Sequence, residues 1–183
     1  MPHPPDIDTL IDKVIALEGD FSDHPADRGG PTRWGVTETV ARSHGYAGDM
    51  RNFPRAQAAA IYRHRYWQRP AFHQVSRLAP SVAAELFDTG INMGTGTASF
   101  FLQRALNALN RGGRDYDDIA VDRLIGARTL AALDAFLRKR GAQGELVLLK
   151  AIESLQGARY IELAESRSAN EAFLYGWLAH RIG

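Results

Sequence analysis

Apolar residues recur at spacings of three and four along nearly the whole chain, and this periodicity is the strongest constraint on the fold. It predicts a first amphipathic helix that begins after Asp6 and ends at Gly19, with an apolar stripe made by Ile7, Leu10, Ile11, Val14 and Leu17. The same spacing predicts helices at residues 37–44, 54–67, 81–88, 97–110, 127–140, 145–165, with an irregularity at Gly157, and 170–182.

Strand signals are nearly absent. One segment, residues 33–36, follows the turn-rich run 23–32 and can form a small hairpin or an extended lip. The sequence therefore predicts a mainly α fold with at most a small β-hairpin.

The length of 183 residues suits one domain with a short helical addition. A second loop-rich run, residues 111–118, separates the first helices from the last three. We expect residues 1–110 to form one region and residues 111–183 to form a helical region packed on it, in one compact unit.

Composition excludes several classes of protein. Hydrophobic residues make up 45% of the chain and charged residues 23%, which is typical of a globular protein. Cysteine is absent, so disulfides, thiolate metal sites and cysteine nucleophiles are excluded, and the histidines lack metal-ligand spacing. We expect no cofactor and no membrane insertion. The amino terminus has no basic or apolar segment of the Sec type, so synthesis in the cytoplasm without a Sec signal is expected.

Charge is distributed unevenly although the formal net charge is only +1. Residues 50–84 contain no Asp or Glu and six arginines: Arg51, Arg55, Arg63, Arg65, Arg69 and Arg77. This run predicts a cationic face suited to an anionic polymer such as bacterial cell wall, or a solvated face with no partner. Nucleic acid is not expected as the partner, because no helix-turn-helix pattern accompanies these arginines.

Glu18 is the most informative residue. It lies four residues after Val14 and seven after Ile11, so it extends the apolar stripe of the first helix. Burial and the carbonyl end of the helix both predict a raised pKa for this carboxyl group. A carboxylic acid that stays protonated near neutral pH can donate a proton to a leaving sugar oxygen. The alternative is that Glu18 turns into solvent at the helix end.

Residues 18–37 resemble a known signature. They read Glu-Gly-Asp-Phe-Ser-Asp-His-Pro-Ala-Asp-Arg-Gly-Gly-Pro-Thr-Arg-Trp-Gly-Val-Thr, and are similar to the motif of glycoside hydrolase family 108, the lysozyme-like N-acetylmuramidases of bacteria and phages. The sequence departs from that motif at Asp20, where glycine is usual, and at Trp34, where tyrosine is commoner. Residues 86–94 resemble a further part of the family, and residues 102–106, 121–130 and 173–178 its predicted peptidoglycan-binding segment. The resemblance implies an all-helical lysozyme-like fold and a general-acid role for Glu18.

Asp27 is the candidate second carboxylate. It follows Glu18 by nine residues, the spacing found in phage-type lysozymes. There it would activate a water molecule, in an inverting scheme, while Thr32 or Thr37 holds that water. Asp27 can instead brace the glycine turn that follows it, and Thr37 can serve as a helix N-cap.

Further candidates are substrate-binding side chains. Trp34, Tyr62 and Trp67 can stack on sugar rings or belong to the core. Asn92 lies between two glycines in an expected loop, where it can bind an N-acetyl group or cap a helix.

These observations predict a peptidoglycan hydrolase, an N-acetylmuramidase that cleaves the β-1,4 bond between N-acetylmuramic acid and N-acetylglucosamine. Its partner would be the glycan strands, and we expect a monomer that acts on the wall or in the periplasm after holin-type or dedicated export. Two alternatives remain open: a lytic transglycosylase, and a non-enzymatic peptidoglycan-binding or secretion-activating module.

Overall fold

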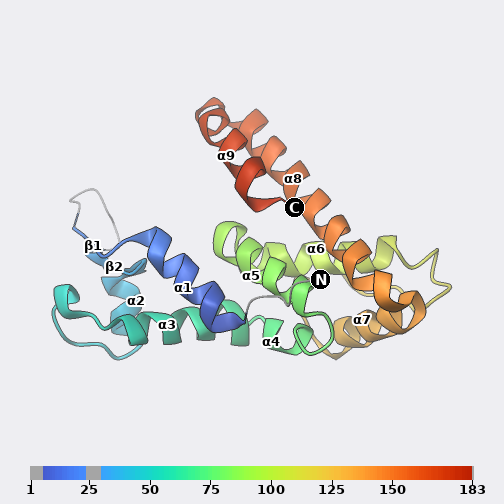
Figure 1. Cartoon of the computed structure of the whole chain (residues 1–183), viewed down its shortest axis with the longest axis horizontal. Coiled ribbons are helices and arrows are strands. Elements are labelled where there is room, and N and C mark those ends of the chain that lie inside the picture. Colours follow the sequence, from blue (N-terminus) through green and yellow to red (C-terminus); the bar gives the residue numbers. More distant parts are fainter. Residues whose placement is uncertain (1–5, 24–29, 183) are drawn as a thin grey trace. The chain divides into compact units, whose positions relative to one another are not determined.

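The computed structural model describes residues 6–23 and 30–182 and confirms the predicted mainly helical fold (Figure 1). The chain forms two compact units, residues 1–69 and residues 70–183. Residues 70–110 thus share a unit with residues 111–183. The functional division at 110/111 stays a prediction.

The first unit holds a helical pair and a small sheet. Its elements are α1 (Ile7–Glu18), β1 (Phe21–Ser22), β2 (Thr32–Arg33), β3 (Val36–Thr37), α2 (Glu38–Ser43), the 3-10 turn η1 (Met50–Asn52), α3 (Arg55–Arg63) and the π-helical turn η2 (His64–Gln68). Helix α1 packs on α3 and buries Ile11 and Ile15 there. Its start is fixed by Asp6, whose carboxylate accepts a hydrogen bond from the Thr9 backbone at 2.9 Å.

Acidic residues on α1 and near η1 partly neutralise the arginine run. Arg55 pairs with Asp12 at 2.7 Å, and Arg63 pairs with Asp8. Arg51 also pairs, with Asp49 at 3.5 Å. The expected cationic face is therefore offset by carboxylates from other segments, which the local count of charges does not reveal.

The sheet is antiparallel, in the order β1-β2-β3. Thr32 is paired with Thr37 and Arg33 with Val36, so residues 34 and 35 form a two-residue turn. Both turn residues have positive φ, +53° for Trp34 and +73° for Gly35, as hairpin turns of type I′ require. The predicted hairpin at residues 33–36 is confirmed, and β1 extends it to three strands.

The second unit is built around a long helix. Its elements are α4 (Phe72–Val75), α5 (Pro80–Met93), α6 (Thr95–Ala108), α7 (Ala127–Arg140), η3 (Gly141–Gln143), α8 (Gly144–Ser166), η4 (Ser168–Asn170) and α9 (Glu171–Arg181). Helix α8 contacts α5, α6, α7 and α9. Its hairpin with α9 is visible in Figure 1. Among the described residues, no helix is long and apolar enough to cross a membrane.

Two details of the predicted helices are wrong. Helix α5 continues past residue 88 to Met93, so Gly90 lies inside it. The position needs glycine because a β-carbon there would come within 3.3 Å of Phe72 and Thr95. Helix α8 runs without irregularity through Gly157, which faces Leu178 of α9 and Ile182 directly after it. Packing against four helices outweighs the preference of glycine against helix, about 1 kcal/mol.

The loop between α6 and α7 is held by a buried side-chain amide. Gln103 is 1% exposed and donates from Nε2 to Asp122 Oδ1 at 2.8 Å and to the Leu124 carbonyl at 2.9 Å. Its Oε1 accepts the Arg123 backbone N–H at 2.9 Å. One side chain therefore replaces several backbone hydrogen bonds that the irregular segment cannot make with itself.

A polar cluster joins α5, α8 and α9. Arg181 on α9 pairs with Asp88 on α5 at 3.0 Å. Burial raises the pKa of the nearby Glu85 to about 7, and the charges of Asp88 and Glu153 add to the rise, while Arg181 opposes it. Beside them the amide of Gln156 is buried without a hydrogen-bonding partner among the described residues.

Glu85 predicts a pH-dependent stability. Its pKa in the folded state, about 7, exceeds its ordinary value of 4.5, so folding retains a proton that the unfolded chain releases. The free energy of unfolding should therefore fall as pH rises from about 4.5 to 7, by up to about 3 kcal/mol. Glu85→Gln should flatten this slope in urea unfolding measured across the pH range. The matched control Glu165→Gln, at an exposed position of α8, should leave it unchanged. An unaltered slope in Glu85→Gln would contradict the assignment.

Candidate active site

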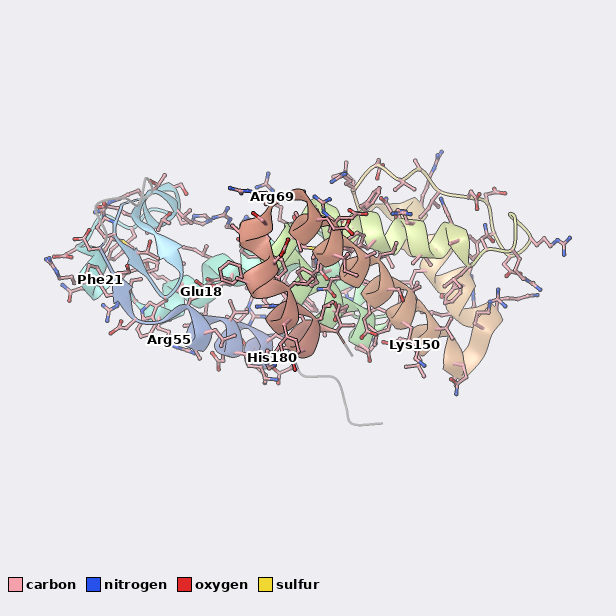
Figure 2. The ribbon with its side chains drawn as sticks, turned by 90° about the horizontal axis from the view of Figure 1, so that it is seen from above. Glu18, Phe21, Arg55, Arg69, Lys150 and His180 are labelled. Atoms are coloured by element: carbon pink, nitrogen blue, oxygen red, sulfur yellow. The ribbon has the colours of Figure 1, made fainter. Side chains whose placement is uncertain are left out.

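Glu18 is the last residue of α1, and Gly19 ends the helix with φ +83° (Figure 2). The burial expected of Glu18 is wrong, because the residue is exposed. The buried stripe of α1 ends at Ile15, and Leu17 is 81% exposed. The last turn of the helix thus extends beyond the core of the first unit. The Glu18 side chain turns into solvent at the helix end, which was the alternative to burial.

The turn of the hairpin lies against the stem of Glu18. A β-carbon at Gly35 would lie 2.8 Å from Glu18 Cγ and would overlap the hydroxyl oxygen of Tyr62. Residue 35 must therefore be glycine for two reasons, this close approach and its positive φ. The Glu18 side chain and the Tyr62 hydroxyl are consequently close neighbours at one backbone position.

Three contacts hold the hairpin turn in this place. The Trp34 backbone N–H donates to the Asp20 carbonyl at 3.0 Å, and Arg33 Nε donates to the Asp20 carboxylate at 2.8 Å. The indole N–H of Trp34 donates to the Phe53 carbonyl at 3.1 Å. Asp20, where the sequence departs from the family motif, thus forms an ion pair that links the end of α1 to the hairpin.

A groove of about 210 Å³ opens beside this turn. We call it the hairpin groove, and it is lined by Gly35, Val36, Thr37, Val40, Ile61, Tyr62, Arg65 and Tyr66. The rings of Tyr62 and Tyr66 stack with centroids 5.8 Å apart, and the Arg65 guanidinium lies 5.8 Å from the Tyr66 ring centre. Aromatic faces with polar rims suit the mixed surface of a sugar.

Tyr62 is a neutral hydrogen-bond donor in this site. The side chain is 6% exposed, and burial, followed by the charge of Glu18, raises the pKa of its hydroxyl well above the ordinary value of 10.0. The phenol therefore keeps its proton at any physiological pH. It can donate to a carboxylate or to a ligand oxygen.

The two candidate threonines differ in position. Thr37 lines the hairpin groove and caps α2, its hydroxyl accepting the Val40 backbone N–H at 3.4 Å. The N-cap alternative is confirmed, and the hydroxyl hydrogen remains available to a ligand. Thr32 lies opposite Thr37 in the sheet and is not among the residues that line the groove.

The structure gives only local surroundings for the other predicted site residues. The indole N–H of Trp34 already binds the main chain, and Trp67 is half-buried in η2. Asn92 lies in α5 rather than in the expected loop, and its amide donates to Asp88. Asp27 falls outside the described residues. The roles of these residues in binding or catalysis stay predictions.

Gly35 and Arg65, which both line the hairpin groove, were not among the site residues expected from the sequence. The dipeptide Trp34-Gly35 between two extended pairs carried a turn signal, but its contacts with Glu18 and Tyr62 arise only from the fold. The π-helical turn could not be read from the sequence either. Its hydrogen bond from the Arg69 N–H to the His64 carbonyl, at 2.9 Å, spans five residues instead of four. This wider turn changes which side chains face the groove.

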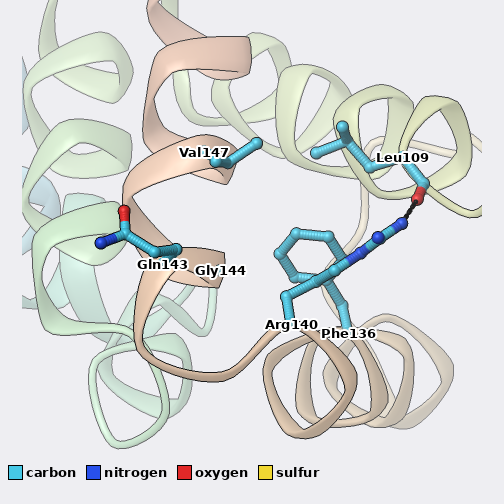
Figure 3. Close-up of a pocket in the computed structure, with 6 residues that line it drawn as sticks. All are labelled: Leu109, Phe136, Arg140, Gln143, Gly144 and Val147. Atoms are coloured by element: carbon cyan, nitrogen blue, oxygen red, sulfur yellow. Dashed lines mark hydrogen bonds between the residues drawn. The ribbon is translucent and has the colours of Figure 1, made fainter.

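A second cavity lies in the other unit, and its arginine stabilises the end of a helix (Figure 3). It has about 240 Å³ and is lined by Leu109, Phe136, Arg140, Gln143, Gly144 and Val147. The Arg140 guanidinium donates to the Leu109 carbonyl at 2.9 Å and pairs with Asp115 at 3.3 Å. Its charge thus caps the end of α6. In the described part of the chain, no group of three or more His, Cys, Asp or Glu side chains is arranged to hold a metal ion.

Glycoside hydrolases cleave with carboxyl side chains, and an acidic side chain next to a groove with stacked tyrosines has groups that such an enzyme uses. Residues 11–94 match the family described as Glycosyl hydrolase 108, and residues 97–182 match the Predicted Peptidoglycan domain. The chain thus carries a glycosyl hydrolase 108 domain followed by a predicted peptidoglycan domain, and it is a lysozyme-like peptidoglycan hydrolase.

One solved structure illustrates the likeness. The chain is similar to the solved structure of SagA from Brucella abortus, with 26% sequence identity and a TM-score of 0.60. The match covers 96% of this chain and 88% of that one. A comparison with curated proteins finds no match.

The close approach at residue 35 makes a test of the site. In Gly35→Ala the new methyl group would meet the Tyr62 hydroxyl and the Glu18 stem. We expect a loss of unfolding free energy about 1–3 kcal/mol larger than in Gly45→Ala, measured by urea unfolding. Peptidoglycan hydrolysis should fall with it, because the Glu18 stem is displaced.

Gly45→Ala is a matched control, since Gly45 also has a positive φ, +86°, but meets no atom within 4 Å. Adding Tyr62→Phe to Gly35→Ala removes the nearest obstructing atom and should restore part of the stability. Equal losses in Gly35→Ala and Gly45→Ala would show that the contact is unimportant.

Proposed function

We propose that the protein is an N-acetylmuramidase that cleaves the β-1,4 bond between N-acetylmuramic acid and N-acetylglucosamine, with Glu18 as the general acid. The observation that carries the proposal is the position of Glu18 against Gly35 and Tyr62, two residues that line the hairpin groove. The family match, which includes residue 18, supports a glycosidic bond as the target.

Exposure of Glu18 fits this role once a glycan is bound. A sugar seated at the groove would exclude bulk water from the carboxyl group. The carboxylic acid then donates its proton to the glycosidic oxygen as the bond breaks. The neutral Tyr62 hydroxyl, held beside Glu18, can stabilise the carboxylate that remains by donating a hydrogen bond to it.

The second half of the reaction needs a water nucleophile. In this proposal Asp27 activates that water, on the strength of its nine-residue spacing from Glu18. The Thr37 hydroxyl, which lines the groove, can hold the water in place. Attack from the face opposite to the leaving group would invert the anomeric centre. We place this reaction at the cell wall, reached by holin-type or dedicated export.

Glu18→Gln tests the general acid. The amide keeps the shape of the side chain but has no acidic proton to transfer, so the rate of clearing of purified cell-wall sacculi should fall about 100-fold or more. Circular dichroism and thermal unfolding should match those of the unmodified protein, since Glu18 is exposed. The matched control is Glu165→Gln, which changes an equally exposed glutamate near the end of α8. Near-full activity of a folded Glu18→Gln protein would overturn the assignment.

Mass spectrometry of the released fragments separates the two glycan-cleaving reactions. A muramidase leaves reducing N-acetylmuramic acid ends, because water is the acceptor. A lytic transglycosylase leaves anhydro-muramyl ends, because the 6-hydroxyl of the sugar replaces water. We expect reducing ends, and anhydro ends would show that the reaction is the transglycosylase one.

A further inference from the structure

The largest cavity among the pockets described here is in the second unit, between α6, α8 and the loop before α7. It has about 470 Å³, within the range of about 300–1,000 Å³ usual for sites that bind small ligands. We call it the arginine groove, and the residues that matter for its chemistry are Phe100, Arg104, Arg123, Leu155, Arg159 and Glu162. All of them lie within the match to the Predicted Peptidoglycan domain.

Two cations converge on one aromatic ring in this groove. The guanidinium carbon of Arg104 lies 5.3 Å from the ring centre of Phe100, and that of Arg123 lies 4.9 Å from it. No carboxylate of the described residues forms an ion pair with either arginine. Arg104 and Arg123 carry like charges on one ring, and a bound anion would offset the repulsion between them.

The nearby acids are already engaged. Glu162 pairs with Arg159 at 3.0 Å, so these two groove residues neutralise each other. Asp122, next to Arg123 in the chain, accepts hydrogen bonds from Gln103 Nε2 and from the Leu124 backbone, at 2.8 and 2.9 Å. The groove therefore keeps an excess of positive charge at Arg104 and Arg123.

The position of Arg123 is fixed by the fold. Its backbone has φ +69°, which is uncommon for a residue with a side chain, and its N–H donates to the buried Gln103 at 2.9 Å. The backbone anchor places residue 123 beside Phe100, and the contact with the ring holds its guanidinium there without an ion pair. A guanidinium held in this way loses little conformational entropy when it binds an anion.

We propose that the arginine groove binds the free carboxylates of peptidoglycan stem peptides through the guanidinium groups of Arg104 and Arg123. Planar guanidinium groups match carboxylates in a two-point geometry, and in peptidoglycan the stem peptides carry most of the free carboxylates. Phe100 and Leu155 offer apolar surface to the alanine side chains of the same peptide. The proposal rests on peptidoglycan as the substrate, but it does not depend on the chemistry of Glu18.

A nucleic acid fits the groove less well. Polyphosphate backbones reward an extended row of cations, whereas this groove is concave and contains the carboxylate of Glu162. The sugar chain alone offers little to guanidinium groups. The groove would thus add recognition of the peptide to recognition of the glycan elsewhere in the protein.

The test is a titration of the unmodified protein with a free stem tetrapeptide, L-alanyl-γ-D-glutamyl-diaminopimelyl-D-alanine, by isothermal titration calorimetry. This probe has no glycosidic bond, so its binding is independent of whether the protein is a muramidase. We expect Arg104→Gln and Arg123→Gln each to raise the Kd about tenfold or more. Both arginines are exposed, so the variants should fold normally. The tetrapeptide with all carboxylates amidated should bind at least tenfold more weakly.

Arg128→Gln is the matched control, because Arg128 is an exposed arginine of the same unit that does not line the groove. It should leave the Kd unchanged. Absence of tetrapeptide binding, equal binding of the amidated peptide, or an equal loss in Arg128→Gln would overturn the proposal. So would tighter, Arg104-dependent binding of a short DNA duplex. Loss of activity in Glu18→Gln tests the muramidase separately.

Discussion

The site depends on one close contact, the approach of the Gly35 backbone to the Glu18 stem and the Tyr62 hydroxyl. Two consecutive residues with positive φ turn the chain sharply enough to bring it there. Asp20 and Phe53 then fix the turn through hydrogen bonds to Arg33 and Trp34. If that turn moved, Glu18 and the Tyr62 hydroxyl would no longer be neighbours at Gly35, which lines the hairpin groove.

Electrostatics separates structural arginines from those available to a ligand. In the first unit, acidic side chains of α1 meet the arginines of α3, so that a run with no acidic residues of its own is partly neutral in the fold. In the second unit, Arg140 donates a hydrogen bond to the carbonyl at the end of α6, and Arg159 forms an ion pair with Glu162. Arg104 and Arg123 are instead held against an aromatic ring. The number of arginines in a segment is therefore a poor guide to where an anion binds.

The sequence could predict the helices because apolar periodicity records which face of each helix is buried. Helix α7 begins and ends where the pattern indicates, at residues 127 and 140. The pattern does not record how far the core extends, and for this reason the burial expected of Glu18 was wrong. Nor could it show the role of Gly90, which packs against Phe72 inside a helix, so that Asn92 was expected in a loop. Contacts such as Gly35 with Tyr62 join residues far apart in the chain and are set by tertiary structure alone.

The π-helical turn η2 has a consequence for how this site could have arisen and how it can change. A bond that spans five residues, from Arg69 to His64, places one more residue in a turn than an α-helix holds. Removing a single residue from positions 64–68 would restore ordinary α-helical winding, because the π turn accommodates one extra residue. The side chains inside the turn, Arg65 and Tyr66 among them, would then change their register relative to Tyr62. The groove wall thus has a built-in register, in which insertion or deletion of one residue is a larger step than any single substitution.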